Sequence, residues 1–171
     1  MQYKILRYLI NERRSLGKFA FPLKNFFRKY FKTNNIIPLV IYDEKNMKKI
    51  ATFSKYRKST KERANLSDAE DLLQFSKINF TKNQTVPKHK HLINPRQTEK
   101  TSEIWIVIRG VFEASIYDND LNLVKSLTLK FGDAIQFHDG GHELVSLKNN
   151  SIIFEVKNGP YKGEKFDRVR F

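Results

Sequence analysis

The second half of the chain alternates between short apolar segments and turn residues. Beyond residue 72, apolar and polar positions alternate in runs of four to nine residues, and Gly, Asp or Asn pairs separate most of these runs. This pattern predicts many short strands with closely spaced turns, which is typical of a β-sandwich or a barrel. The expected strands span residues 72–80, 86–92, 103–109, 111–118, 123–130, 134–137, 142–147 and 151–157.

The first third has a different pattern. Apolar residues at helical spacing predict helices at 1–16 and 22–32, and Asn34-Asn35 ends the second pattern. Two short strands are expected next, at 36–42 and 49–54, as edge strands of this barrel or of a partner's barrel. Pro38 favours an edge or a strand start. Residues 55–66 are expected to form a loop. The sequence thus divides into a helical extension at 1–35, edge strands and a polar loop at 36–71, and a barrel at 72–171.

Composition narrows the class of protein. The 171-residue chain contains no cysteine, which excludes disulfides, Cys-ligated zinc and a cysteine nucleophile. No run of about 20 apolar residues is present, as a membrane span would need. A signal peptide is not visible at the N-terminus, so a cytoplasmic location is the expectation.

The positive charge is concentrated at the front of the chain. The formal net charge is +14, and residues 1–35 contain nine Lys and Arg but a single acidic residue, Glu12. The 22–32 helix carries Phe and Tyr on one side and Lys and Arg largely on the other. Its aromatic face can dock on the body, or the helix can lie peripherally on an anionic membrane. Nucleic acid is a less favoured partner because no recognition motif is present.

Four residues carry the candidate chemistry. His89 and His91 are two positions apart, so on a strand both imidazoles share one face. Glu103 begins an apolar strand, and His142 follows the Gly140-Gly141 turn. Three imidazoles and a carboxylate suit a divalent transition metal such as Fe, Mn, Ni or Zn, with positions left for water or substrate.

These residues resemble a motif of the cupin superfamily, G-x5-H-x-H-x3,4-E-x6-G. Asn83 stands at the first glycine position, and Glu103 is followed after six residues by Gly110. The interval from His91 to Glu103 is longer than in the motif. The second motif, G-x5-P-x-G-x2-H-x3-N, is matched more weakly from Gly132 to His142. The resemblance implies a jelly-roll barrel, a metal at its mouth, bound here by His89, His91, Glu103 and His142, and frequent homodimers.

The C-terminal segment resembles small cupins encoded among surface-polysaccharide genes. It reads Phe-Glu-Val-Lys-Asn-Gly-Pro-Tyr at 154–161 and Phe-Asp-Arg-Val-Arg-Phe at 166–171. This likeness implies a metal-dependent enzyme, an isomerase or epimerase, that acts on a sugar or sugar nucleotide. A metal- or sugar-binding module without turnover and an Fe(II)-dependent dioxygenase are the alternatives.

Several further residues are candidates for the same site. Glu99 is the substitute ligand if the long interval shifts Glu103. His138 is either a proton shuttle in the pocket or a turn residue at the surface, and we favour the surface. His138 and Tyr161 are the catalytic candidates, and Arg96 and Trp105 are the substrate-binding candidates.

Overall fold

The computed structural model describes residues 38–57 and 62–171, which belong to one compact unit, Ile36–Phe171. Within these residues the protein is mainly β, with a single short helix, α3 (Glu164–Asp167). The expected helices at 1–16 and 22–32 lie outside the described residues. Ten strands are described: β1 (Leu39–Asp43), β2 (Lys48–Ser54), β3 (Arg63–Asn65), β4 (Ser76–Ile78), β5 (Glu103–Arg109), β6 (Val111–Tyr117), β7 (Leu123–Lys130), β8 (Ala134–Phe137), β9 (Gly141–Ser146) and β10 (Ile152–Lys157).

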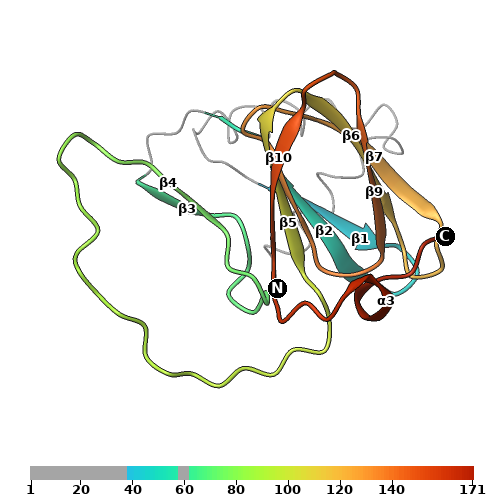
Figure 1. The fold of residues 1–171 in the computed structure, drawn as a ribbon, viewed down its shortest axis with the longest axis horizontal. Coiled ribbons are helices and arrows are strands. Elements are labelled where there is room, and N and C mark those ends of the chain that lie inside the picture. The colour runs from blue at the N-terminus through green and yellow to red at the C-terminus, as the bar shows by residue number, and fades with distance from the viewer. Residues whose placement is uncertain (1–37, 58–61) are drawn as a thin grey trace, which may run out of the picture. The chain divides into compact units, whose positions relative to one another are not determined.

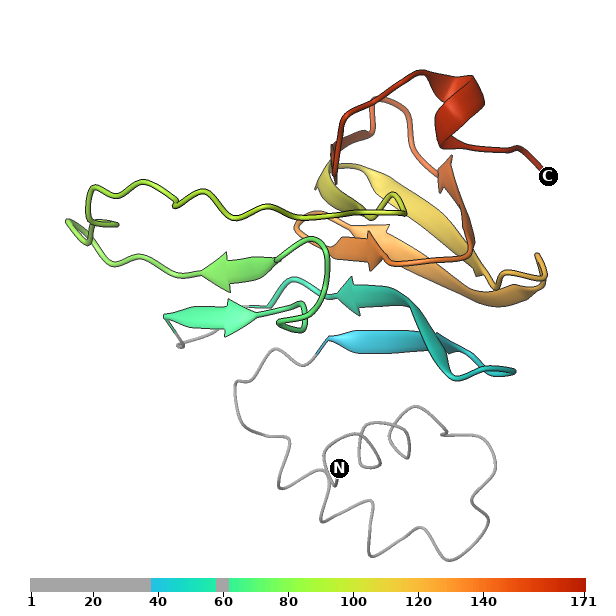
Figure 2. The same cartoon turned by 90° about the horizontal axis from the view of Figure 1, so that it is seen from below.

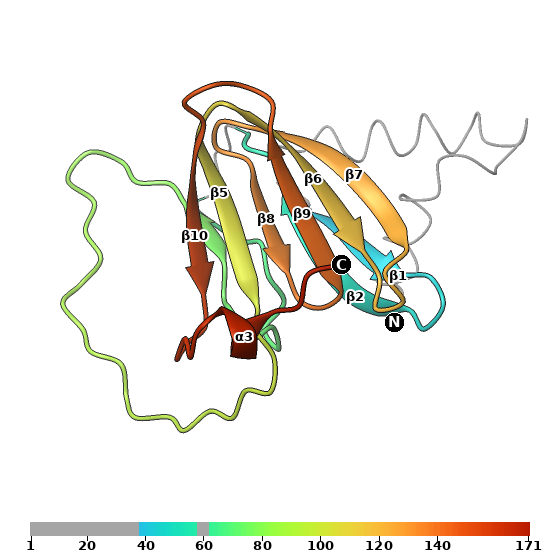
Figure 3. The same ribbon diagram turned by 45° about the vertical axis from the view of Figure 1, so that its right-hand side comes forward.

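Two antiparallel sheets face each other as a β-sandwich (Figure 1). One has five strands in the order β1-β2-β8-β5-β10, and the other has three in the order β7-β6-β9. Figure 3 shows the start of β5, the end of β8 and the start of β9 at the same end of the sandwich. The strands β1 and β2 therefore extend this chain's own sheet. Among the described strands, β1 forms one edge of this sheet and β10 the other.

The core lies between the two sheets. Its fully buried members come from both, with Ile135 of β8 on one side and Ala114 and Leu129 on the other. Successive strand residues face opposite sides. Trp105 and Val107 therefore point inward on β5, as do Ile135 and Phe137 on β8.

A bulge in β2 decides which residues reach the outer face of the five-stranded sheet. Ile41 pairs with Ala51 and Tyr42 with Lys49, which leaves Ile50 as the extra residue. Ile50 and Ala51 are both buried in the core. The bulge shifts the alternation, so that Lys49 and Thr52 both lie on the outer side.

The segment before β5 departs most from expectation. β3 lies within the stretch predicted as loop, only residues 76–78 of the predicted 72–80 strand form β4, and these two strands pair as a hairpin. The predicted strand at 86–92 is wrong, because residues 79–102 contain no strand. Pro87 lacks a backbone donor, and no described strand pairs with this segment. Figure 2 shows the hairpin and the following loop beside the sheets.

Candidate functional site at the end of the sandwich

Glu103 and His142 come together although 39 positions separate them in the sequence. Glu103 is the first residue of β5 and pairs with Phe137 at the end of β8. His142 lies at the start of β9, which belongs to the opposite sheet. The register of both sheets thus places the carboxylate and the imidazole at the same end of the core. This meeting of Glu103 and His142 is part of the constellation expected from the sequence.

The two side chains are in direct contact. Nε2 of His142 lies 3.4 Å from Oε2 of Glu103, and the side chains are 28% and 13% exposed. The Trp105 indole Nε1–H donates to Oε1 of the same carboxylate. The imidazole stacks on Phe137, with ring centres 4.1 Å apart, and meets Trp105 edge-on. Glu103 therefore has donors on both oxygens, and His142 is held by aromatic rings as well as by the carboxylate.

The carboxylate of Glu103 is kept ionised. Burial acts to raise its pKa, but the contact with His142, the Trp105 hydrogen bond and the charge of Lys157 together hold the pKa below its ordinary value. Glu103 is therefore a weak base and a good acceptor at neutral pH. The Glu103 carboxylate is therefore suited to orienting a histidine or a ligand donor, and less suited to accepting a proton.

His142 keeps one ring nitrogen without a partner. Its Nδ1 is buried and makes no hydrogen bond with the described residues. Buried polar atoms are nearly always satisfied, so this nitrogen is a candidate ligand atom. With Nε2 directed at the carboxylate, Nδ1 is the atom left with a free lone pair.

The backbone before His142 depends on two glycines. Gly140 has φ of 72°, and a side chain there would collide with the carbonyl oxygen of Tyr117. A side chain at Gly141 would collide with the ring of Phe171, which packs edge-on against Tyr117 with ring centres 5.2 Å apart. The turn before His142 therefore lies close to the backbone of Tyr117 and to the ring of Phe171.

The tail is also fastened beside Glu103. Thr101 donates to Asp167 of α3 at 3.1 Å, and Lys157 donates to the same carboxylate at 3.2 Å. Lys157 Nζ also lies 4.6 Å from the centre of the Tyr161 ring. Tyr161 itself is exposed. Lys157, whose charge acts on Glu103, contacts the Tyr161 ring and so links this tyrosine to the site. The catalytic role of Tyr161 stays a prediction.

The histidine pair of the loop lies apart from this site. His89 and His91 are exposed, with ring centres 5.3 Å apart, and Nδ1 of His89 contacts the carbonyl oxygen of Pro87 at 2.8 Å. In the part of the chain that is described, no group of three or more His, Cys, Asp or Glu is arranged to hold a metal. The four-ligand site stays a prediction, of which the structure assembles the Glu103–His142 half.

The remaining candidates divide between loop and core. Arg96 and Glu99 are exposed in the same loop. Trp105 is 7% exposed, so it lies beneath the Glu103–His142 pair rather than on an open wall. The substrate roles of Arg96 and Trp105 stay predictions. Asn83 has φ of 66°, which is the positive value expected of a residue in a glycine position.

His138 occupies a second cluster, on the outer face of the five-stranded sheet. The surface position favoured for it is wrong, because its side chain is only 10% exposed. Its backbone N–H donates to Ile50 at 2.8 Å and prolongs β8 along β2, so its side chain points opposite to Phe137. There Nε2 lies 2.9 Å from Oγ1 of Thr52, and Nδ1 lies 3.8 Å from Oδ1 of Asp71.

Sequence reasoning did not find the partners of His138. Lys49 Nζ contacts Asp71, and it contacts Asp68 at 3.0 Å. Lys49 begins the strand predicted at 49–54, and Asp68 and Asp71 lie in the 36–71 segment, to which no candidate chemistry was assigned. The available signal was Lys49, a charged residue at the start of an apolar run.

Comparisons with family models, with curated proteins and with solved structures find no match to this chain. Homodimer formation and the cupin resemblance therefore stay predictions. Among the described residues, no helix is long and apolar enough to cross a membrane.

Proposed function

We propose that this protein is a cupin-type barrel that binds a divalent transition metal and a small sugar-related molecule at the Glu103–His142 end. Three features support the proposal: two facing antiparallel sheets, a core shared between them, and a carboxylate–imidazole pair at one end of that core. A jelly-roll arrangement of the strands is part of the proposal.

The observation that carries it is the state of the His142 ring. A histidine that ligates a metal commonly directs its other ring nitrogen at a carboxylate, which fixes the ring and its tautomer. His142 has this arrangement, with Glu103 at Nε2 and an orphan buried Nδ1. The donor chemistry fits a metal such as Zn, Fe, Mn or Ni.

The contacts of Glu103 favour an orienting role in this proposal. Both of its oxygens already face donors, from Trp105 and His142. His89 and His91 then supply the other imidazoles, and this requires the 79–102 loop to fold toward the site. Eleven residues lie between His91 and Glu103, a length that can span about 40 Å when extended. Chain length therefore permits the approach.

The residues of the chain have separate tasks in the proposed reaction, an isomerisation or epimerisation of a sugar or sugar nucleotide. A bound metal supplies Lewis-acid polarisation of a carbonyl or hydroxyl oxygen. Glu103 holds the His142 ring, and Phe137 and Trp105 exclude water from one side of it. Tyr161, whose ring lies 4.6 Å from Lys157 Nζ, is the proposed group that takes the proton from one position of the sugar and returns it to the product, so that no proton is gained or lost overall.

A binding module without turnover is the second candidate, and the low pKa of Glu103 favours it. A carboxylate with two donors and a depressed pKa is a poor base for removing a proton from a ligand hydroxyl. It is suited to holding neighbouring side chains in fixed positions. Recovery of each bound sugar unchanged after long incubation would select the binder, whereas a product peak would select the enzyme.

Metal analysis of tag-free protein tests the proposal. The parent chain should retain about one transition-metal ion, and His142→Ala, His89→Ala and His91→Ala should each lower the occupancy sharply. His138→Ala is the matched control, because it removes the fourth histidine without touching the proposed ligands. Equal metal content in the parent and in His142→Ala would overturn the metal site.

We also propose that residues 1–35 contact anionic membrane surfaces, and their charge supports this proposal. Sedimentation with anionic vesicles, comparing the full chain with a variant carrying Lys24→Gln, Arg28→Gln and Lys29→Gln, tests it. Equal binding by the two proteins would contradict the proposal.

A further inference from the structure

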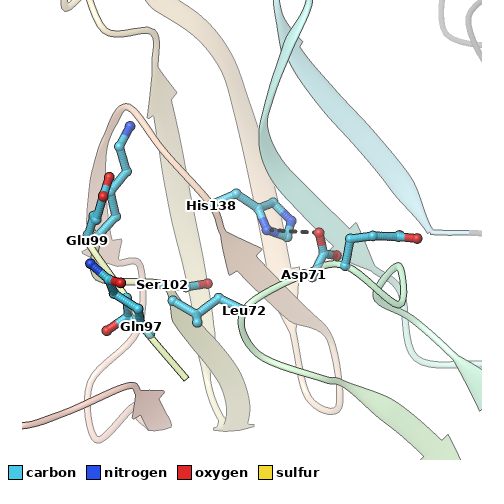
Figure 4. Close-up of a pocket in the computed structure, with 9 residues that line it drawn as sticks. Asp71, Leu72, Gln97, Glu99, Ser102 and His138 are labelled. Carbon is cyan, nitrogen blue, oxygen red and sulfur yellow. Dashed lines mark ion pairs between the residues drawn. The ribbon is translucent and has the colours of Figure 1, made fainter. Parts of the chain in front are cut away.

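A cleft of about 560 Å³ opens beside His138, and we call it the His138 cleft. One wall comes from the turn after β3, with Asp71 and Leu72, and the other from the end of the long loop, with Gln97 and Glu99 (Figure 4). His138 lies between them and points toward Asp71. The proposed metal and sugar site does not use this cleft.

The cleft and the Glu103–His142 site lie on opposite sides of one sheet. Phe137 points into the core and stacks on His142, whereas the next residue, His138, points outward. A ligand in the cleft is therefore separated from His142 by the backbone of β8. Residues 97–99 of the long loop line the cleft, and the proposed metal site requires this loop to move, so binding in the cleft is tested on metal-free protein.

The polar atoms at the floor of the cleft leave a gap of defined size. Nδ1 of His138 and Oδ1 of Asp71 are 3.8 Å apart, which is too far for a hydrogen bond. The His138 side chain is nine-tenths buried, and its only hydrogen bond within the described residues is the one from Nε2 to Thr52. Lys49 Nζ also contacts Oδ1 of Asp71, so an ammonium in the gap would share this oxygen with Lys49 while donating a second N–H to His138 Nδ1.

Three carboxylates and one ammonium group line the cleft, Glu70, Asp71 and Glu99 against Lys100, so the lining favours a cation although Lys49 also contacts Asp71. Burial is the largest cause that lowers the His138 pKa, to about 4, with the nearby charge of Lys49 adding to it against the opposing effect of Asp71 and Asp68. The imidazole is therefore neutral near pH 7 and can accept a hydrogen bond. Lys100 is engaged by Asp139 at 2.6 Å. Glu99 forms no ion pair or hydrogen bond with other described residues, so its negative charge remains available.

We propose that the His138 cleft binds an amine-bearing organic cation, whose ammonium group donates to His138 Nδ1 and to Asp71. Glu99 contributes attraction from the opposite wall, and Leu72 offers an apolar surface to the alkyl part of the ligand. The class of ligand is an alkyl diamine or an amino sugar. This function is additional to the proposed metal and sugar site and does not depend on it.

Calorimetric titration of the full chain with 1,4-diaminobutane tests the proposal, with 1,4-butanediol as the uncharged probe of matched length. The diamine should bind one to one, and the diol should give no saturable heat. Glu99→Gln should weaken binding about threefold, the effect of one exposed charge. His138→Gln should weaken it about tenfold, through the loss of the ring acceptor. Glu113→Gln, an exposed carboxylate on β6, is the control and should bind as the parent does.

A second readout protects the test against a variant that fails to fold. In the parent, the diamine should shift the imidazole resonance of His138 and leave those of His89 and His91 unchanged. His142→Ala should bind the diamine normally, which distinguishes this site from the proposed metal site. Absence of saturable binding, equal binding of the diol, or affinity unchanged by both Glu99→Gln and His138→Gln would overturn the proposal.

Discussion

Replacing Glu103 with glutamine should weaken the fold in a pH-dependent way. The substitution keeps the size of the side chain but removes its charge. Glu103 accepts from Trp105 Nε1 and faces His142 Nε2 at 3.4 Å. The glutamine oxygen can serve one of these donors, while its NH₂ group faces the other. One charge-assisted contact is therefore lost.

The magnitude follows from the burial of this pair. Hydrogen bonds to charged groups contribute about 1.5–3 kcal/mol when they are well made and shielded from water. The contact here is longer than ideal, and the His142 side chain is 28% exposed. We therefore expect Glu103→Gln to lower the free energy of unfolding by about 1–2 kcal/mol at pH 7.

The sign of the pH dependence is fixed by the direction of the pKa. The pKa of Glu103 lies below its ordinary value of 4.5 in the folded chain. Its ionised form thus stabilises the fold above about pH 4.5, and this contribution is lost as pH falls through the lower folded-state pKa. The difference between Glu103→Gln and the parent should shrink over the same range.

Urea unfolding of metal-free protein, followed by tryptophan fluorescence, measures this difference. Trp105 is the only tryptophan of the chain, and its indole contacts Glu103, so the probe reports on the site itself. Glu155→Gln on β10 is the control for removing an exposed carboxylate. A Glu103→Gln variant as stable as the parent at pH 7, or a loss of stability independent of pH, would show that the Glu103 charge does not stabilise the fold.

Three further predictions follow from the same structure, two on pairs of substitutions and one on the titration of His138. Ile135→Ala, at a fully buried core position, should cost about 2–5 kcal/mol in urea unfolding, whereas the exposed Leu123→Ala should change stability by less than about 0.5 kcal/mol; similar costs would contradict the assigned core. Gly140→Ala should destabilise more than Gly163→Ala, because both have positive φ but only Gly140 also meets backbone, and equal midpoints would contradict this. An NMR titration should show His138 uncharged down to about pH 4, so that stability falls between pH 6.5 and 4 as the unfolded chain takes up the proton; a midpoint near 6.5 would refute its burial.

The sequence predicted the strands of the two larger sheets, but not β3, which pairs with β4. Alternation along 103–109, 123–130 and 134–137 corresponds to β5, β7 and β8 with the same bounds. It did not predict the register between strands, which depends on contacts between distant segments. The bulge at Ile50 is an example, since no local signal shows that Ile50 and Ala51 both face inward.

The candidate site was predicted in part for a similar reason. Glu103 begins β5 after the long loop, and His142 follows the Gly140-Gly141 turn near the start of β9, so the fold brings these two predicted residues together. The His89–His91 interpretation assumed a strand, whereas the segment has Pro87 and no pairing neighbour. The position of His138 was predicted wrongly because its partners, Thr52 and Asp71, lie in distant segments whose sequence pattern indicated no functional residues.

The most direct test of the central claim is an anomalous diffraction map of crystals of the tag-free protein grown with its own metal. The map should show one anomalous peak beside Nδ1 of His142, about 2.0–2.1 Å from it, with the imidazoles of His89 and His91 at similar distances and the loop closed toward the sandwich. A map with no anomalous peak at His142, or with an ion bound only elsewhere on the chain, would contradict it.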